Sequence, residues 1–353
     1  MKLFNDEPVN TGRQRELDWA RGFAVIFMIL VHVKSELPGF HLSDVYSKII
    51  GFVGSPLAAP TFMILLGAGI VYSRKNEPKK IAIQGIKLLI LHYALNIVAF
   101  GVPNLIMLIR TQDVSYIEEL FKQVFDVDIL AFAGLTFLFF ALCIKLKLKT
   151  IHIVLITLLI ACLNYVFTRF ISNYWYGTLL GLFVRVNEHS FFPFMAWIGY
   201  PVMGYIFGSY LKRCNNKRYL YKNLFAISVL VVIAITLGSQ KYGFDIWSMN
   251  LGADDYYYQD FVSYILVGGI CFTWISLLYF LSEVKALYFA GKQLTRYSNN
   301  TTVIYFTQWV IIGWISILSL IDFPVNPWIN LLTGIGVIIA SDAIAVLYKR
   351  LMK

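Results

Sequence analysis

The sequence predicts an all-α, polytopic membrane protein with about ten transmembrane helices in one bundle. Of its 353 residues, 58% are hydrophobic and only 14% are charged, and the mean hydropathy is +0.67. Long apolar segments, each able to cross about 30 Å of hydrocarbon as a helix, follow one another along the chain. The Lys and Arg residues are divided unequally between alternate loops. We therefore expect a single transmembrane domain over 1–353, in which 1–16 form a cytoplasmic N-terminal segment, and no soluble domain.

Ten segments have the length and apolar character of a transmembrane helix. In order along the chain they are 17–35, 49–73, 81–105, 128–145, 150–168, 191–211, 223–238, 261–281, 301–321 and 328–348. The interval 170–190 has too short an apolar core for an eleventh span, so it could be re-entrant or interfacial instead. The segment 116–125 is predicted to be short, amphipathic and at the surface. Because the first span has no A-x-A-like cleavage site, we do not interpret it as a removable signal peptide.

The charged residues predict which side of the membrane each loop faces. Both termini and the loops 74–80, 145–149, 212–222 and 282–300 are assigned to one side. That side carries 22 of the 30 Lys and Arg, whereas the opposite loops carry seven of them and 13 of the 20 Asp and Glu. The positive-inside rule then places both termini in the cytoplasm. This asymmetry explains the net charge of +10, so no nucleic acid partner is expected.

Arg21 and His32 lie on the first predicted span, with ten residues between them. On a helix that turns about 100° per residue, eleven steps return to within roughly 20° of the starting direction, so both side chains share one face. The rise of about 16 Å places Arg21 near one membrane surface and His32 about halfway across. Ionisable groups at such depth usually face a protein interior or a wet cavity, and a His there could take a proton near neutral pH. The alternative is a structural pair, an interfacial Arg and a His satisfied inside the bundle.

Many basic residues stand at predicted cytoplasmic helix ends, which could converge on one mouth. They are Arg21, Lys79, Lys80, Lys87, Lys212, Arg213, Lys217, Arg218, Lys292 and Arg296. A ring of this kind suits a phosphate-rich cytosolic ligand. Lys87 is the most suggestive of them because it lies about two turns inside its helix. The alternative for each residue is that it only fixes the topology.

The loops on the opposite side mix carboxylates with aromatic rings. This mixture suits a carbohydrate, because rings can stack on sugar faces while acids bind hydroxyl groups. The alternative is an aromatic belt at the level of the lipid headgroups. The candidate substrate-binding residues are Trp197, Asp254, Asp255 and Tyr257. The four Cys residues have no metal-like spacing, so neither a metal site nor a disulfide framework is expected.

Five stretches, in order, resemble the transmembrane acyltransferase superfamily. The first is Arg15–Gly22 followed by His32, and the others are Ala58–Gly67, Asp128–Leu135, Phe191–Gly208 and Asn299–Tyr305. They are most similar to the branch of heparan-alpha-glucosaminide N-acetyltransferase-like proteins, which is related to the acyltransferase-three family. The resemblance covers nearly the whole chain. It implies transfer of an acyl group, usually acetyl, from cytosolic acyl-CoA to a hydroxyl or amine of a sugar across the membrane.

The resemblance also implies roles for single residues. In the acyltransferase-three branch the His of the first helix is catalytic and the Arg assists it, which points to His32 and Arg21, with Asp18 paired to Arg21 along one flank. In the heparan-type enzyme the critical His lies in the first extracytoplasmic loop, where this chain has His41, so the choice between the two stays open. The Arg-x-x-Arg expected near the third helix is present here only as Gln84–Lys87, so Lys87 could do part of that work.

The implied donor is acetyl-CoA, with its phosphates in the basic mouth. One His is sufficient for acyl transfer when it removes the acceptor proton, or it could itself become acylated. Asn299, Asn300 or Arg21 could supply hydrogen bonds to the donor and to the developing oxyanion.

Two other classes of function stay open at this point. A secondary transporter or exporter of a sugar or lipid-linked substrate would suit helices broken near Pro56, Pro60, Pro193 and Pro201, although no paired repeats support it. A non-catalytic membrane sensor or scaffold is the third class. The expected partners are an acyl-CoA donor, a sugar or glycan acceptor and the lipid bilayer. The identity of the acceptor, O- versus N-transfer and the oligomeric state, for which a homodimer is one possibility, stay open.

Overall fold

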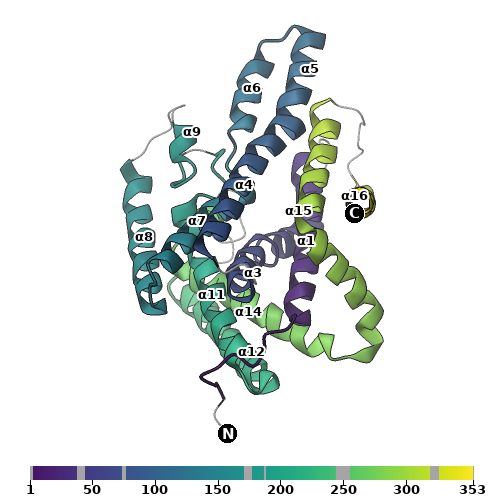
Figure 1. The fold of residues 1–353 in the computed structure, drawn as a ribbon. Helices are drawn as coiled ribbons and strands as arrows, with labels where there is room; N and C mark the ends of the chain where they lie inside the picture. Colours follow the sequence, from purple (N-terminus) through teal and green to yellow (C-terminus); the bar gives the residue numbers. More distant parts are fainter. Residues whose placement is uncertain are drawn as a thin grey trace. The chain divides into compact units, whose positions relative to one another are not determined.

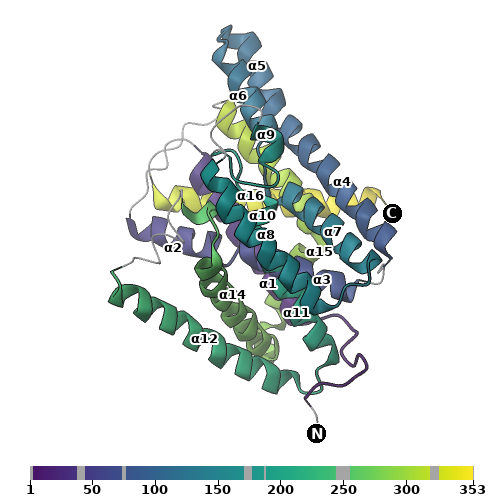
Figure 2. The same ribbon diagram turned by 90° about the vertical axis from the view of Figure 1, so that its left-hand side faces the viewer.

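The structure is a computed structural model that describes residues 3–37, 44–73, 77–170, 177–186, 188–243, 255–318 and 326–352. These residues form helices and turns, and within them the only β-type pairings are two isolated bridges, Phe4 with Cys214 and Val127 with Ser190 (Figures 1 and 2). Among the described residues, six helical segments are long and apolar enough to cross a membrane. They are Val45–Tyr72, Pro78–Thr111, Thr150–Thr168, Lys217–Lys241, Phe261–Ser282 and Pro327–Leu351. The prediction of an all-α, polytopic membrane protein is therefore confirmed.

The six long apolar segments are fewer than the ten predicted spans, and the difference has a physical reason. The predicted spans 17–35 and 301–321 lie largely on α1 (Arg15–Glu36) and α15 (Tyr288–Ile317), which are long enough but rich in polar residues. α7 (Ile129–Lys145) is apolar but shorter than the others. The predicted span 191–211 is divided between the short helices α10 (Phe194–Trp197) and α11 (Gly199–Arg213). Some of the polar residues that lower the hydropathy of α1 and α15 belong to the candidate site described below.

The chain folds into two compact units, which are described separately. The first unit comprises Met1–Leu17, Pro60–Leu91 and Val127–Val284, and the second comprises Asp18–Ala59, His92–Asp126 and Lys285–Lys353. In the first unit lie most of α3 (Ala59–Tyr72) and α4 (Pro78–Asn96), followed by α7, α8 (Thr150–Phe170), α9 (Gly177–Leu180), α10 (Phe194–Trp197), α11 (Gly199–Arg213), α12 (Lys217–Lys241), η2 (Asp255–Tyr257) and α14 (Phe261–Ser282). In the second lie most of α1, then α2 (Asp44–Gly54), η1 (Ile97–Gly101), α5 (Val102–Thr111), α6 (Ser115–Val124), η3 (Lys285–Leu287), α15 and α16 (Pro327–Leu351). A single domain over the whole chain stays a prediction.

Several helices begin where the sequence places a short polar side chain. Asp128 caps α7 by accepting a hydrogen bond from the backbone N–H of Leu130 at 2.8 Å. Asn216, Asp260 and Asn326 cap α12, α14 and α16 in the same way. Such caps satisfy backbone donors that have no partner in the first turn of a helix.

Close packing of α3 against α11 organises the first unit. A Cβ atom added at Gly67 would lie 1.8 Å from the carbonyl oxygen of Pro201, and one added at Gly204 would lie 1.8 Å from that of Ile64. Both positions therefore require glycine, because the two backbones are in contact. Small residues of this kind let membrane helices approach closely where no hydrophobic effect drives them together. In the same unit α12 and α14 lie side by side (Figure 2).

In the second unit α1 and α15 run side by side in the same direction. Trp19 on α1 lies against Gly291 on α15, and Gly22 lies against the backbone of Leu294. α16 runs in the opposite direction, because Lys349 near its end reaches Asn299 while Gly334 nearer its start lies against Leu30. The beginning of α1, the beginning of α15 and the end of α16 therefore lie at the same end of this unit.

The long helical segment Pro78–Thr111 contains the π-helical turn η1 just before Pro103. π-Helical turns are rare, and many of them lie at functional sites. Here the carbonyl oxygen of Ala99 would be 2.4 Å from a Cβ atom at Gly313, so η1 packs directly on α15. The segment predicted to be amphipathic, 116–125, is the helix α6, which packs beside α5 (Figure 1).

Candidate functional site

His32 lies on the face of α1 that packs on α15. Its Nδ1 atom is 3.2 Å from Oε1 and 3.1 Å from Nε2 of Gln308, whose side chain is fully buried. The ring of Trp309 stacks on the imidazole with centroids 4.1 Å apart and an interplanar angle of 30°. When Nδ1 carries the proton and donates a hydrogen bond to Oε1 of Gln308, the other ring nitrogen is left with the lone pair that a base or a nucleophile needs.

Arg21 and Asp18 form a second polar group on α1, and Ser298 of α15 joins them. Ser298 donates a hydrogen bond to Oδ1 of Asp18 at 3.0 Å and accepts one from Nη1 of Arg21 at 3.3 Å, while Arg21 and Asp18 are 3.9 Å apart. The side chain of Asp18 is 9% exposed and that of Arg21 is 28% exposed. The predicted pairing of the two residues is thus present, and Ser298 is a partner that the sequence did not reveal. Arg21 and His32 stand about 16 Å apart along α1, as helix geometry requires.

A basic depression of about 380 Å³ lies between the start of α15 and the end of α16. It is lined by Lys292, Thr295, Arg296, Asn299, Asn300, Val346, Lys349 and Arg350. Four of these residues, Lys292, Arg296, Asn299 and Asn300, are predicted donor-binding residues. Lys349 and Arg350 were missed, although a pair of cations in the last turn of the last helix is a signal that could have found them.

Two contacts hold the wall of the basic depression. Asp342 of α16 forms an ion pair with Arg296, and Nζ of Lys349 donates a hydrogen bond to the carbonyl oxygen of Asn299 at 3.1 Å. Four cations line the basic depression, and Asp342 neutralises one of them. The electrostatic potential in the depression is therefore positive. The Oδ1 atom of Asn300 is buried there and accepts no hydrogen bond from any described residue. The cations of the depression can therefore bind phosphate groups, and Oδ1 of Asn300 can accept a hydrogen bond from an N–H donor.

Apart from Arg21, the other predicted donor-binding cations belong to the first unit. Lys79, Lys80 and Lys87 are exposed on α4, and Lys80 pairs with Glu77 at 2.6 Å. Lys212 donates a hydrogen bond to the carbonyl oxygen of Val71 at 2.9 Å. Arg213 donates one to the carbonyl oxygen of Asn5 at 2.7 Å. The contacts of Lys212 and Arg213 anchor the backbone of their own unit, and a role for these five cations at the mouth stays a prediction.

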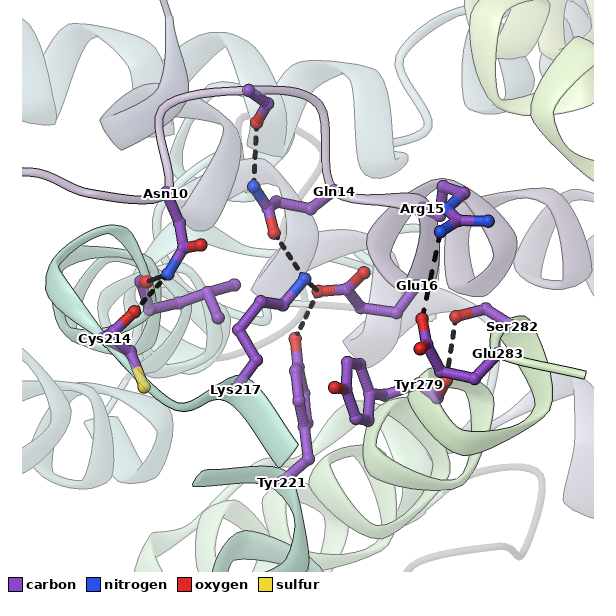
Figure 3. A network of polar contacts seen from close by, with 12 residues as sticks. Asn10, Gln14, Arg15, Glu16, Cys214, Lys217, Tyr221, Tyr279, Ser282 and Glu283 are labelled. Carbon is purple, nitrogen blue, oxygen red and sulfur yellow. Dashed lines mark hydrogen bonds and ion pairs between the residues drawn. The ribbon is translucent and has the colours of Figure 1, made fainter. Parts of the chain in front are cut away.

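A buried ion pair fixes the start of α1 within the first unit (Figure 3). Glu16, which is 2% exposed, accepts contacts from Nζ of Lys217 at 2.6 Å and from the hydroxyl of Tyr221 at 2.9 Å. Lys217 also reaches Oε1 of Gln14 at 2.7 Å and lies 5.3 Å from the ring centroid of Tyr279. Lys217, expected at the mouth or as a topology signal, is thus engaged in holding the N-terminal segment.

The predicted substrate-binding residues fall partly in one aromatic cluster of the first unit. The ring of Phe192 lies 5.0 Å from that of Trp197 and 5.6 Å from that of Tyr257. Trp197 is fully buried, so its ring offers no face to a sugar in this structure. Asp254 lies outside the described residues, and so does the side chain of Asp255. His41 lies outside them too. Within the described residues no group of three or more His, Cys, Asp and Glu is placed to hold a metal ion.

The described residues thus form a polytopic helical membrane protein in which a histidine of α1 contacts a buried carboxamide of α15, and a basic depression lies between α15 and α16. Residues 13–241 match the family described as heparan-alpha-glucosaminide N-acetyltransferase, catalytic. Because the match covers more than half of the chain, the chain belongs to this family of membrane acetyltransferases. No curated protein and no solved structure matches the chain. The matched region contains Arg21 and His32, whereas Ser298, Gln308 and the basic depression lie beyond it.

Proposed function

We propose that this protein transfers an acetyl group from cytosolic acetyl-CoA, through the membrane, to a hydroxyl or amine of a sugar or glycan on the opposite side. The observation that carries the proposal is the arrangement of the second unit. The basic depression stands at the same end of the α1 and α15 pair as Arg21, and His32 lies about 16 Å farther along α1. The phosphates of acetyl-CoA would bind the depression, and its pantetheine arm would extend along the helices toward His32.

The residues of the basic depression match the chemistry of this donor. Lys292, Arg296, Lys349 and Arg350 supply cations for its phosphates, and phosphate favours Arg and Lys in this way. The buried Oδ1 of Asn300 supplies an acceptor for an amino group such as that of adenine. Membership in an acetyltransferase family agrees with an acetyl donor.

In the proposed reaction His32 handles the proton. The acceptor oxygen or nitrogen attacks the thioester carbonyl, a C–O or C–N bond forms, and the C–S bond breaks. His32 takes the proton of the acceptor as the attack begins and returns it to the CoA sulfur. Gln308 and Trp309 orient the ring, and the nitrogen that faces away from Gln308 would take the proton. An acetyl-histidine route would use the same nitrogen and the same ring orientation.

The direction of transfer rests on the charge distribution and on the helix directions. With 22 of the 30 Lys and Arg assigned to one set of loops, the positive-inside rule favours a cytoplasmic location for that set. In the second unit Arg21 of α1 and the end of α16 lie at the same end of the helices, as expected for two helix ends on one side of the membrane.

A binding measurement tests the donor site. In detergent-purified protein, we expect the double variant Lys292→Gln/Arg350→Gln to weaken acetyl-CoA binding about tenfold or more, because two phosphate-binding charges are lost. Lys122→Gln, which removes a half-buried cation that pairs with Glu118 on α6 of the same unit, is the matched control and should leave the affinity unchanged. If the wild type, the double variant and Lys122→Gln bind acetyl-CoA with equal affinity, the basic depression is not the donor site.

A vesicle experiment tests the transfer. In sealed vesicles of known orientation, acetyl-CoA added on the cytoplasmic side should label an acceptor such as glucosamine enclosed on the opposite side, and CoA should leave on the side from which it came. Product that forms only when donor and acceptor share a compartment would contradict transfer across the membrane. His32→Ala should abolish product in either case while acetyl-CoA binding persists.

A further inference from the structure

Arg185, in the first unit, is a buried cation that the proposed reaction does not use. The residue is 8% exposed, and its Nε and Nη1 atoms are fully buried and make no hydrogen bond to any described residue. Its guanidinium carbon lies 4.3 Å from the ring centroid of Tyr258 and 5.1 Å from that of Tyr257. These cation–π contacts reduce the electrostatic cost of burial but occupy no N–H group. A buried guanidinium is ordinarily paired with an anion or fully hydrogen-bonded, and within the described part of the chain this one is neither.

The backbone around Arg185 is fixed, so the side chain is not simply a loose surface residue. Its neighbours Val184 and Val186 are 4% and 5% exposed. The loop that precedes Arg185 is hydrogen-bonded to α10, because the backbone N–H of Met195 donates to the carbonyl oxygen of Phe183 at 2.9 Å. The guanidinium is therefore held in place beneath the two tyrosine rings by the fold of the loop itself.

A second buried donor lies in the same aromatic cluster. The indole Nε1 of Trp197 is buried and finds no acceptor among the described residues, and Trp197 is linked to Tyr257 through the ring of Phe192. At the edge of the cluster Tyr258 is 52% exposed, so a ligand can approach there. The unsatisfied groups of Arg185 and Trp197 are all N–H donors, and their chemical complement is an acceptor with negative charge.

We propose that Arg185, with Tyr257 and Tyr258, forms a binding site for an oxyanion group, a carboxylate, sulfate or phosphate, that a ligand carries. The planar guanidinium matches the two oxygens of such a group, and a partner of this kind would satisfy its buried donors. The two tyrosine rings would contact the part of the ligand that bears the group. Either an acidic sugar or an anionic lipid headgroup has this chemistry. The site does not depend on the proposed acetyl transfer, because no residue of it takes part in donor binding or proton transfer.

The test measures binding and uses no acetyl-CoA. The full-length protein is placed in nanodiscs of phosphatidylcholine, and its unfolding temperature is measured with sodium glucuronate or inorganic phosphate, against sodium chloride of equal ionic strength and against glucose. A second arm replaces part of the phosphatidylcholine by phosphatidylglycerol. We expect a rise on the order of 5 °C with saturating anion in at least one arm and none with glucose. The arm that responds identifies a soluble acid or a lipid as the source of the oxyanion.

Three variants separate a binding role from a structural one. Arg185→Met should abolish the anion-dependent rise and should unfold, without anion, at the same or a higher temperature than the wild type, because a buried unsatisfied charge is removed. Arg185→Lys should keep a smaller rise, since a lysine keeps the charge but not the fork of donors. Arg110→Met, at an exposed position of α5, should respond like the wild type. A wild type that responds to none of the probes, or an Arg185→Met variant that is destabilised and still responds, would overturn the proposal.

Discussion

Gln308 provides the sharpest test of the site, because it contacts His32 and stands apart from the basic depression. Gln308→Leu removes the carboxamide, whose oxygen and nitrogen lie 3.2 and 3.1 Å from Nδ1 of His32. It puts an apolar side chain of similar size in its place. We expect turnover to fall and the affinity for acetyl-CoA to stay unchanged, since Gln308 is about 12 Å along α15 from Asn300. In this interpretation Gln308 is a positioning residue that acts through His32.

The expected magnitude follows from the hydrogen bond that is lost. A buried group that loses its partner costs about 1–3 kcal/mol. If this cost falls on the transition state, where the imidazole must carry the proton, kcat drops by about 5- to 150-fold. A fall in kcat near the lower limit of this range would mean that Trp309 keeps the imidazole of His32 oriented without Gln308. The centroids of the two rings lie 4.1 Å apart.

The assay measures kcat for acetyl transfer and, separately, the equilibrium affinity for acetyl-CoA in detergent-purified protein. Gln293→Leu is the matched control, the same substitution on the same helix about 22 Å nearer its start. An unchanged kcat in Gln308→Leu, or a loss of acetyl-CoA affinity as large as the loss of kcat, would refute the assignment of Gln308 as a positioning residue for His32.

Two further predictions concern the fold. Lys217→Met removes the cation 2.6 Å from the buried carboxylate of Glu16, so the free energy of unfolding should fall by about 3 kcal/mol, whereas Lys222→Met, exposed on the same helix, should have little effect. Thermal denaturation measures the stability of both variants. Adding Glu16→Gln to Lys217→Met should recover part of the lost stability. Equal stability of Lys217→Met and the wild type would contradict the role of the ion pair. Gly204→Ala places a Cβ atom 1.8 Å from the carbonyl oxygen of Ile64 and should yield little folded, monodisperse protein on size-exclusion chromatography. Gly336→Ala, where a Cβ atom meets nothing within 4 Å, should behave like the wild type, and a well-folded Gly204→Ala protein would show that α3 and α11 can separate at this point.

Parts of the site could be predicted from the sequence because they depend on one helix at a time. Asp18, Arg21 and His32 lie on one helix, and the geometry of that helix alone brings Asp18 to Arg21 and spaces Arg21 from His32. The caps at Asp128 and Asp260 are local in the same sense, since each carboxylate bonds to a backbone N–H two or three residues ahead. The amphipathic helix α6 was likewise predicted from its own residues.

Lys217 shows what reasoning from single positions does not provide. In the sequence it is one of a run of basic residues between two spans, which is the ordinary pattern of a cytoplasmic loop. In the structure its ammonium group pairs with Glu16, about two hundred residues earlier in the chain. Whether a cation binds a ligand, fixes the topology or neutralises a buried carboxylate depends on its neighbours in space.

The sequence by itself determined that the protein is an all-α membrane protein of an acyltransferase type and that Arg21 and His32 share a helix face. Only the tertiary structure paired His32 with Gln308, joined Ser298 to Asp18, and set Lys349 and Arg350 beside Lys292 and Arg296. The physical reason is that a membrane helix is apolar both toward lipid and toward its neighbours, so its hydropathy pattern does not specify which helix it packs against or with which rotation. That choice is made by close contacts such as Gly22 on Leu294 and Gly291 on Trp19, and it decides which polar side chains meet.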